Sequence, residues 1–175
     1  MKHLRVILTG FMGTGKTAVG EVLAKRLGYQ FLDTDLMVEE ETGKTVTEIF
    51  EKEGETSFRV YEKKMVKKAL EKEKVVVATG GGAVTDPETL QWMKSRGVMI
   101  GLSASADSIL QRVSSMQTRP LLKTKDQLKK IKGLLSERSP YYREADRIID
   151  TTSRSVEETV QEILKALPEN GNSPR

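Results

Sequence analysis

The chain has 175 residues, of which 37% are hydrophobic and 31% charged, and these values predict one folded domain rather than a disordered or fibrous protein. It has no cysteine and one histidine, His3, and no apolar run of the roughly 18 residues that a membrane span needs, so we expect a cytoplasmic protein without disulfides, histidine metal clusters or membrane contact. The net charge of +4 is spread along helical patterns such as Lys63-Lys64, which favours solvated helix faces over a surface for nucleic acid.

The first half of the chain opens with an apolar run at residues 4–9, which predicts a buried parallel strand that ends in a glycine-rich turn. Apolar residues at helical spacing then predict a helix from Lys16 that ends at Gly28. Residues 31–32 predict a short second strand that leads into Asp33. The capping-box spacing at residues 45–48 predicts a short helix that stops near Gly54, and a longer charged helix follows over 57–73.

The second half repeats the alternation. Residues 74–78 predict the central strand, and Asp86 with Pro87 predicts the start of a helix that runs through Ser95. Residues 98–102 predict a fourth strand, followed by a helix from about Ser105. A further helix from Asp126 is bent or restarted by Pro140, and the chain ends with a strand at 147–150 and an amphipathic helix at 155–167.

This alternation predicts a three-layer α/β/α fold, with a five-stranded parallel sheet between two layers of helices. The right-handed crossovers of such a fold place the carboxyl ends of the strands, and the ligand site, at one edge. We predict a single domain over residues 1–167, with a mobile lid at about 115–125 where the sequence has no period. Residues 168–175 are expected to form a flexible tail.

The turn after the first strand carries a phosphate-binding motif. Residues 10–17 read Gly-Phe-Met-Gly-Thr-Gly-Lys-Thr and fit G-x-x-x-x-G-K-[ST] at every fixed position. Glycines let backbone N–H groups surround a polyphosphate, Lys16 supplies a charge for the β- and γ-phosphates, and Thr17 offers a hydroxyl to Mg²⁺. The sequence therefore predicts binding of ATP or GTP with Mg²⁺ through Gly13, Thr14, Gly15, Lys16, Thr17 and Ala18.

Other residues narrow the class of nucleotide-binding protein. A guanine-specific GTPase needs an Asn-Lys-x-Asp segment, yet the only asparagines are Asn170 and Asn172, and no Asp-x-x-Gly segment is present. Transport ATPases and recombinases need a longer chain with further motifs. A short P-loop chain with an aperiodic segment around residue 119 favours a small-molecule kinase.

Five further segments make the resemblance specific. They are Asp33-Thr34-Asp35, Phe58-Arg59-Val60-Tyr61-Glu62, Thr79-Gly80-Gly81-Gly82, Arg119-Pro120-Leu121-Leu122 and Glu137-Arg138-Ser139-Pro140-Tyr141-Tyr142. Together with the P-loop, they resemble the shikimate kinase family in order and spacing, from about Ile7 to Ala166. The resemblance implies a monomeric P-loop kinase that uses Mg²⁺ and transfers the ATP γ-phosphate to the 3-hydroxyl of shikimate, a step toward chorismate and the aromatic amino acids.

The acceptor residues make chemical sense for a hydroxylated acid. A carboxylate is best held by planar, bidentate donors, which arginine provides and lysine does not. The resemblance implies that Arg59 and Arg138 hold the shikimate carboxylate and that Asp35 holds its hydroxyls. Taken alone, Arg59 is better interpreted as a surface residue paired with Glu55 or Glu62, but Phe58 before it and Glu62 after it favour the site. Backbone N–H groups of Gly80, Gly81 and Gly82 are expected to lie against the ring of the acceptor.

The remaining predicted site residues are expected to bind the metal and the nucleotide. Asp33, at the end of a strand, is expected to reach Mg²⁺ together with Thr17, because the strand at 75–79 carries no acidic residue at its end. The resemblance implies that Arg119 closes over the phosphates as an arginine finger supplied in cis. We expect Arg112 to stack on adenine and Arg154 to lie in the adenine loop.

Three alternatives remain open at this point. A gluconate kinase has a similar framework, although the Arg59 segment and the triple glycine argue against it. A nucleoside monophosphate kinase would need a base-reading pocket that nothing here suggests. A non-catalytic nucleotide-binding regulator or an RNA-binding module would belong to a different class, and the chain has no aromatic-rich strand for stacking bases.

Overall fold

Five parallel strands form a single sheet at the centre of the computed structural model, which describes residues 5–114 and 126–168. The sheet order is β2-β3-β1-β4-β5, and every neighbouring pair is parallel. The fold class predicted from the sequence is confirmed. The strands are β1 (Arg5–Gly10), β2 (Gln30–Asp33), β3 (Val75–Ala78), β4 (Val98–Ser103) and β5 (Arg147–Asp150).

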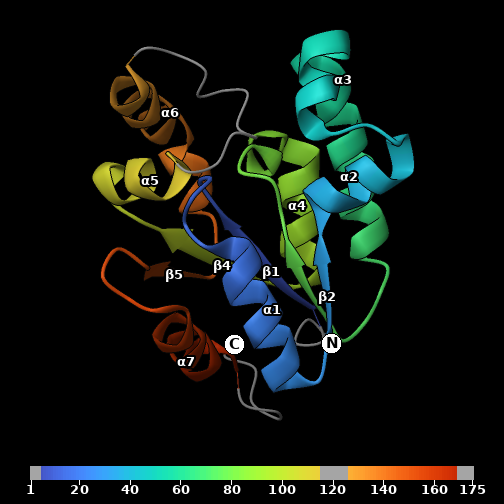
Figure 1. Cartoon of the computed structure of the whole chain (residues 1–175). Helices are drawn as coiled ribbons and strands as arrows, with labels where there is room; N and C mark the ends of the chain where they lie inside the picture. Colours follow the sequence, from blue (N-terminus) through green and yellow to red (C-terminus); the bar gives the residue numbers. More distant parts are fainter. Residues whose placement is uncertain (1–4, 115–125, 169–175) are drawn as a thin grey trace.

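Within residues 5–114 and 126–168, seven α-helices and a short 3-10 helix accompany these strands (Figure 1). The predicted helix boundaries hold to within a few residues at most positions, with Gly28 and Gly97 ending helices as expected. The helices are α1 (Lys16–Leu27), α2 (Thr34–Thr42), α3 (Val46–Ala69), α4 (Pro87–Arg96), α5 (Ala106–Val113), α6 (Gln127–Tyr142) and α7 (Val156–Ala166), and the 3-10 helix is η2 (Ala83–Thr85).

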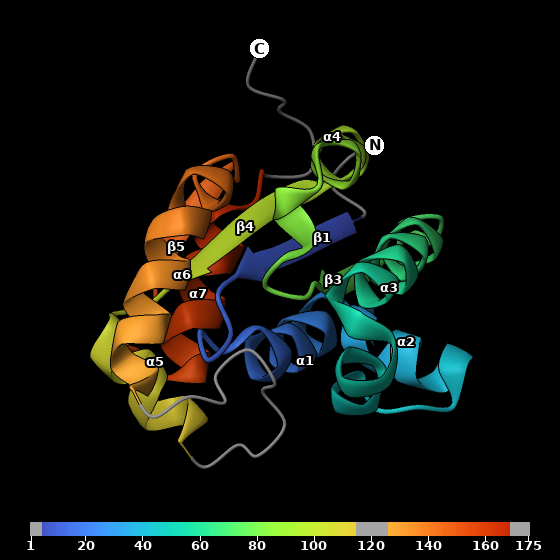
Figure 2. The same ribbon diagram turned by 90° about the horizontal axis from the view of Figure 1, so that it is seen from above.

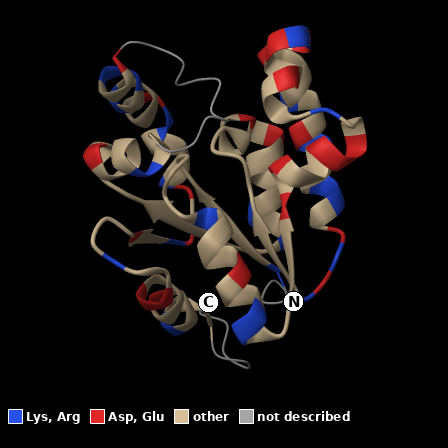
Figure 3. Cartoon of the chain, viewed as in Figure 1, with Lys and Arg blue, Asp and Glu red and all other residues tan. Residues whose placement is uncertain are grey.

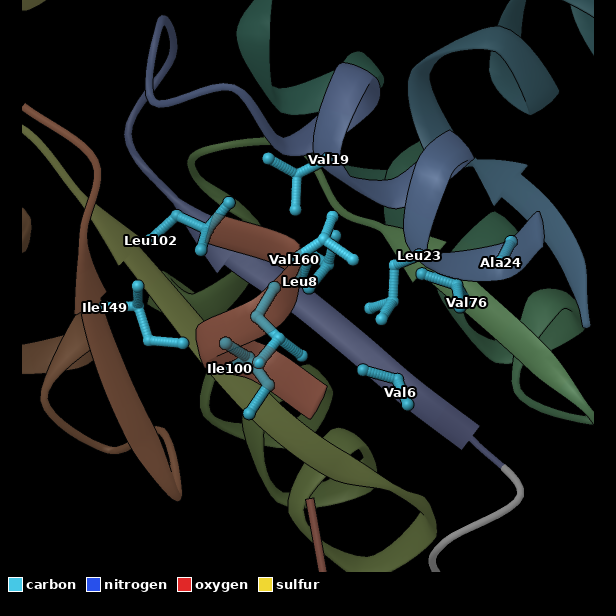
Figure 4. Close-up of a cluster of buried hydrophobic side chains, with 11 residues drawn as sticks. Val6, Leu8, Val19, Leu23, Ala24, Val76, Ile100, Leu102, Ile149 and Val160 are labelled. Carbon is cyan, nitrogen blue, oxygen red and sulfur yellow. The ribbon is translucent and has the colours of Figure 1, made fainter. Parts of the chain in front are cut away.

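The two faces of the sheet bury different side chains because successive strand residues point to opposite sides. Val6 and Leu8 of β1 pack with α1 and α7 in the cluster drawn in Figure 4. Ile7, between them, faces the other side and packs with residues of α3, α4 and η2. Both layers of helices are therefore held by the same short strands, and β1 is fixed in the middle with its carboxyl end leading into the P-loop.

The structure differs from the sequence prediction in the segment between residues 34 and 70. Helix α2 was not predicted, and Asp33 caps it by accepting hydrogen bonds from the backbone N–H groups of Asp35 and Leu36. The two helices predicted on either side of Gly54 are confirmed as two parts of α3, separated by non-helical backbone at Gly54, where φ is +84°. The second of them ends at Ala69 rather than Glu73.

Two groups of helices lie on either side of α1 at the ligand-binding edge of the sheet. In both views, α5 and α6 lie on one side of α1, and α2 and α3 lie on the other (Figures 1 and 2). The P-loop at the start of α1 therefore lies between the helices that carry Arg112 and Arg138 and those that carry Asp35 and Arg59. No helix within the described ranges is long and apolar enough to cross a membrane.

Basic residues of α3 pair with acidic neighbours, and Figure 3 shows that blue and red segments occur together in this part of the chain. Lys64 and Lys68 both contact Glu41 of α2, and Lys63 and Lys67 both contact Glu88 of α4. These four lysines therefore have acidic partners on neighbouring helices of the protein itself.

Candidate active site

The P-loop wraps around the start of α1 with the backbone that the motif predicts. Gly13 and Gly15 have φ values of +77° and +95°, a region that side-chain-bearing residues rarely adopt. Gly10 is required for another reason, since a Cβ there would lie 2.2 Å from the carbonyl oxygen of Leu102. The loop is consequently fixed by its glycines before any ligand binds.

Lys16 and Thr14 stabilise this loop from within. The Lys16 ammonium donates to the carbonyl oxygens of Gly10 and Phe11, at 2.8 and 2.9 Å. The buried Thr14 hydroxyl also donates to Phe11, at 2.7 Å. Lys16 therefore lies across the mouth of the loop, where its charge faces the position of a polyphosphate.

The two residues predicted to hold Mg²⁺ lie side by side. The Thr17 hydroxyl donates to Asp33 Oδ2 at 2.9 Å, while Asp33 Oδ1 caps α2. A hydroxyl and a carboxylate oxygen suit Mg²⁺, which binds hard oxygen ligands and keeps several waters. Among the described residues, no three His, Cys, Asp or Glu side chains cluster as a metal centre. The donor set thus fits a metal that is shared with nucleotide phosphates rather than caged by protein.

A cavity of about 510 Å³ joins the nucleotide region to part of the acceptor region. It is lined by the predicted residues Gly13, Gly15, Lys16, Thr17, Ala18, Asp33, Asp35, Gly80, Gly81 and Arg112. Of the other predicted residues in the described ranges, Arg59, Gly82 and Arg138 lie beside this cavity against the glycine loop. A nucleotide at the P-loop would therefore share an open space with an acceptor at Asp35.

The glycine loop, residues 80–82, brings together charged side chains from three helices. A Cβ on Gly80 would lie 2.1 Å from Glu62 Oε1 and 3.0 Å from Asp35 Oδ1. A Cβ on Gly82 would lie 2.3 Å from the Arg59 guanidinium, and one on Gly81 would lie 3.5 Å from Arg138 Nη1. A side chain at Gly80 or Gly82 would thus displace Glu62 or Arg59, whereas a Cβ at Gly81 would only contact Arg138.

Arg59 is held at this loop by two carboxylates. Its Nη1 donates to Glu62 Oε2 at 2.7 Å, and its Nη2 donates to Glu55 Oε1 at 3.0 Å. Arg59 therefore makes both of the ion pairs expected of a surface arginine, with Glu55 and with Glu62. However, the Arg59–Glu62 bond lies at the glycine loop, and the Glu62 side chain is only 3% exposed. This pairing orients Arg59 toward the loop rather than toward solvent.

Glu62 is a site residue that the sequence reasoning quoted but did not assign. Burial raises the pKa of Glu62 to about 7; Asp35 adds to the rise, and Arg59 and Arg138 oppose it. Arg138 is itself 5% exposed, with its guanidinium 5.9 Å from the ring centroid of Phe11 in the P-loop. The acceptor region is thus a cluster of two acids and two arginines, in which Glu62 and Arg138 are buried and Asp35 and Arg59 are partly exposed.

Thr151 and Arg112 connect the P-loop to the end of β5, the edge strand of the sheet. The Arg112 guanidinium donates to the Gly13 carbonyl at 3.1 Å and to the Thr151 carbonyl at 2.7 Å. The Thr151 hydroxyl, 3.0 Å from the Thr14 carbonyl, lies within hydrogen-bond distance of the same loop. Sequence reasoning missed Thr151, because a single threonine after a short strand carries no signal of this contact.

One predicted arginine of the described residues, Arg154, lies apart from the cavity. Arg154 is exposed, donates to the Asp150 carbonyl and does not line the cavity. Arg119 and the segment predicted as a lid, 115–125, lie outside the described residues, as does the predicted tail beyond Pro168.

The fold and this site define the class of protein: a P-loop kinase whose acceptor site has arginines suited to a small acid. A sequence model of the shikimate kinase family matches residues 12–168. The chain is 46% identical over 161 residues to the shikimate kinase of Caldanaerobacter subterraneus subsp. tengcongensis, covering 92% of this chain and 94% of that one. It is 45% identical over 165 residues to the shikimate kinase of Pelotomaculum thermopropionicum, covering 94% and 96%. The chain belongs to the shikimate kinase family.

Solved structures agree with this assignment. The shikimate kinase of Acinetobacter baumannii, in complex with shikimate, superposes with a TM-score of 0.91 at 38% identity, over 94% of this chain and 92% of that chain. The shikimate kinase of Aquifex aeolicus superposes with a TM-score of 0.80 at 38% identity, over 93% and 95%. The family predicted from the P-loop and five segments is therefore confirmed.

Proposed function

We propose that this chain transfers the γ-phosphate of ATP to the 3-hydroxyl of shikimate, releasing ADP and shikimate 3-phosphate. Membership of the shikimate kinase family supports this reaction. The observation that carries it within the molecule is the cluster of Asp35, Arg59 and Arg138 around a side-chain-free glycine loop, next to the P-loop cavity.

The proposed roles follow from the chemistry of each group. P-loop N–H groups and Lys16 bind the phosphates, Arg112 and Arg154 serve the adenine side, and Arg59 and Arg138 bind the acceptor carboxylate with paired N–H donors. Asp35 orients the attacking hydroxyl and accepts its proton as the bond to the γ-phosphorus forms and the bond to the ADP oxygen breaks. Positioning supplies most of the rate of such a transfer, since its loose transition state asks little of a base.

The metal and the arginine finger complete the proposal. Thr17 and Asp33 would hold Mg²⁺, which supplies neutralising charge to the β- and γ-phosphates. The role proposed for Arg119 is that of an arginine finger, which would stabilise charge on the transferred phosphoryl group. The active unit is proposed to be a monomer in the cytoplasm, formed by one domain over residues 1–167; the family resemblance and the absence of cysteine support this part of the proposal.

The test is ADP release from MgATP with shikimate, gluconate, AMP or no acceptor. Release that depends on shikimate alone is the expected result. Release with gluconate or AMP instead would keep the P-loop kinase and overturn the acceptor. Measurable ATP binding without release for any acceptor would overturn the enzymatic function.

A further inference from the structure

The carbonyl groups of the glycine loop are fixed in two different ways. The Gly80 carbonyl accepts from the backbone N–H of Ala83 at 3.1 Å, and the Gly82 carbonyl accepts from that of Thr85 at 3.0 Å. Both bonds are local, and they form as the chain turns into η2. The carbonyl of Gly81 is held differently, by a side chain from a distant helix.

That side chain is Tyr142, in the last turn of α6. Its phenol donates to the Gly81 carbonyl oxygen at 2.6 Å, across 61 positions of sequence. Its ring packs with the hydrophobic clusters on both sides, around Met99 and around Phe11 of the P-loop. The hydroxyl therefore has a rigid support, and the bond ties the glycine loop to the helix that carries Arg138.

Holding the Gly81 carbonyl also fixes the next N–H group. Gly81 C=O and Gly82 N–H belong to one planar trans peptide unit, so they point in opposite directions. Two consecutive glycines leave the rotation of this unit nearly unrestrained by side chains, because both flanking residues reach a wide range of φ and ψ. Without an external partner, the direction of the Gly82 N–H would not be set by the loop alone.

Gly82 lies where that direction matters. An added Cβ there would meet the Arg59 guanidinium, so this part of the loop lies against the side chain assigned to the acid group of the acceptor. Among the described residues, the N–H groups of Gly81 and Gly82 have no acceptor within the protein, whereas the carbonyls of both glycines are satisfied. A buried backbone N–H without a protein acceptor needs a hydrogen-bond partner, and an oxygen atom of a ligand can supply one.

We propose that Tyr142 is a positioning residue for the acceptor: its hydroxyl orients the Gly81–Gly82 peptide so that the Gly82 N–H donates to an oxygen of the bound acid. In this proposal Tyr142 acts through this peptide and does not touch the acceptor itself, although its phenol also interacts with the Arg138 guanidinium. Burial raises the pKa of the Tyr142 phenol to about 12, so the donor keeps its proton at every working pH. The inference rests on the proposed function, since it presumes that a hydroxylated acid binds at the glycine loop.

The experiment replaces Tyr142 by phenylalanine, which removes the hydroxyl and keeps the ring in the core. The matched control is Tyr141→Phe, which removes the same group from the more exposed neighbour. Wild-type enzyme is first assayed for shikimate-dependent ADP release, so that failure of the proposed function is detected separately. KM for shikimate, KM for MgATP, kcat and the thermal midpoint are then measured for all three proteins between pH 6 and 9.

Loss of one neutral hydrogen bond predicts that Tyr142→Phe raises KM for shikimate about three- to tenfold, with KM for MgATP within about twofold of wild type. The increase should be the same at each pH, and Tyr141→Phe should show none. Calorimetric titration of shikimate into the variant should give the same loss of affinity. A lower thermal midpoint with unchanged KM for shikimate, or equal increases in both KM values, would show a merely structural role and overturn the proposal.

Discussion

Replacing Gly80 by alanine probes the acceptor site with a single added methyl group. The ideal Cβ would lie 2.1 Å from Glu62 Oε1, whereas ordinary C···O contacts are about 3.3 Å, so the carboxylate must retreat by about 1 Å. Glu62 is buried and its other oxygen is 2.7 Å from Arg59 Nη1, so the retreat stretches that bond beyond the usual range of about 3.2 Å. The methyl group therefore acts on Arg59 through Glu62.

The size of the effect follows from the cost of overpacking. Crowding a well-packed site costs about 1–3 kcal/mol. The variant relaxes in the free state, and shikimate must restore the competent arrangement on binding, so this cost falls on acceptor affinity. We expect KM for shikimate to rise about 5- to 150-fold, using about 1.4 kcal/mol for each factor of ten.

The assay is steady-state ADP release at varied shikimate and, separately, at varied MgATP. Gly133→Ala is the matched control, because a Cβ at this α6 position meets nothing within 4 Å and should leave both KM values unchanged. A second variant, Gly80→Ala with Glu62→Asp, shortens the acid and should recover part of the affinity. Wild-type shikimate KM in Gly80→Ala, or equal increases in both KM values, would refute the reasoning.

Three further predictions concern the nucleotide, the metal and pH. Lys16→Ala should lower kcat at least about 100-fold with little change in thermal midpoint, whereas Lys25→Ala, exposed in the same helix, should keep wild-type kcat. Asp33→Asn should raise the Mg²⁺ concentration needed for half-maximal rate but keep the thermal midpoint, because asparagine caps α2 as well as aspartate does; a large loss of stability with unchanged Mg²⁺ dependence would contradict this role. Because the pKa of Glu62 is raised in the folded protein, its carboxyl keeps its proton between about pH 4.5 and about pH 7, whereas in the unfolded chain it has lost it. The free energy of unfolding therefore falls as pH rises through this range, by up to about 1.4 kcal/mol per pH unit. The thermal midpoint of Glu62→Gln relative to wild type should therefore increase over that window, and a constant difference would show that Glu62 titrates normally.

The elements that could be predicted from the sequence are those with local signals. Strand β1, the P-loop and α1 follow from an apolar run, a motif and a C-terminal glycine, all of which act within a few residues. Helix α2 also had such signals, since Asp33 is an N-cap residue and Gly43 has the left-handed φ of +66° typical after a helix. It was missed because the segment 33–35 was interpreted only as a site motif, although Asp33 both caps the helix and faces Thr17.

The site residues that could be predicted are likewise those that belong to local sequence motifs. Motif spacing identifies the groups that face ligands, such as Lys16 and Asp35, because those groups recur in a fixed chemical pattern. Spacing within one helix offers Glu62 as a partner of Arg59, but it does not show that Glu62 is buried against the glycine loop or that Tyr142 bonds to Gly81, because these contacts form only when the helices close around the sheet. Such partners determine whether a ligand-facing group is already aligned when the substrate arrives, and this alignment supplies much of the rate in phosphoryl transfer. The substitutions at Gly80 and Tyr142 therefore measure the part of catalysis that the fold supplies, separately from the groups that the motifs name.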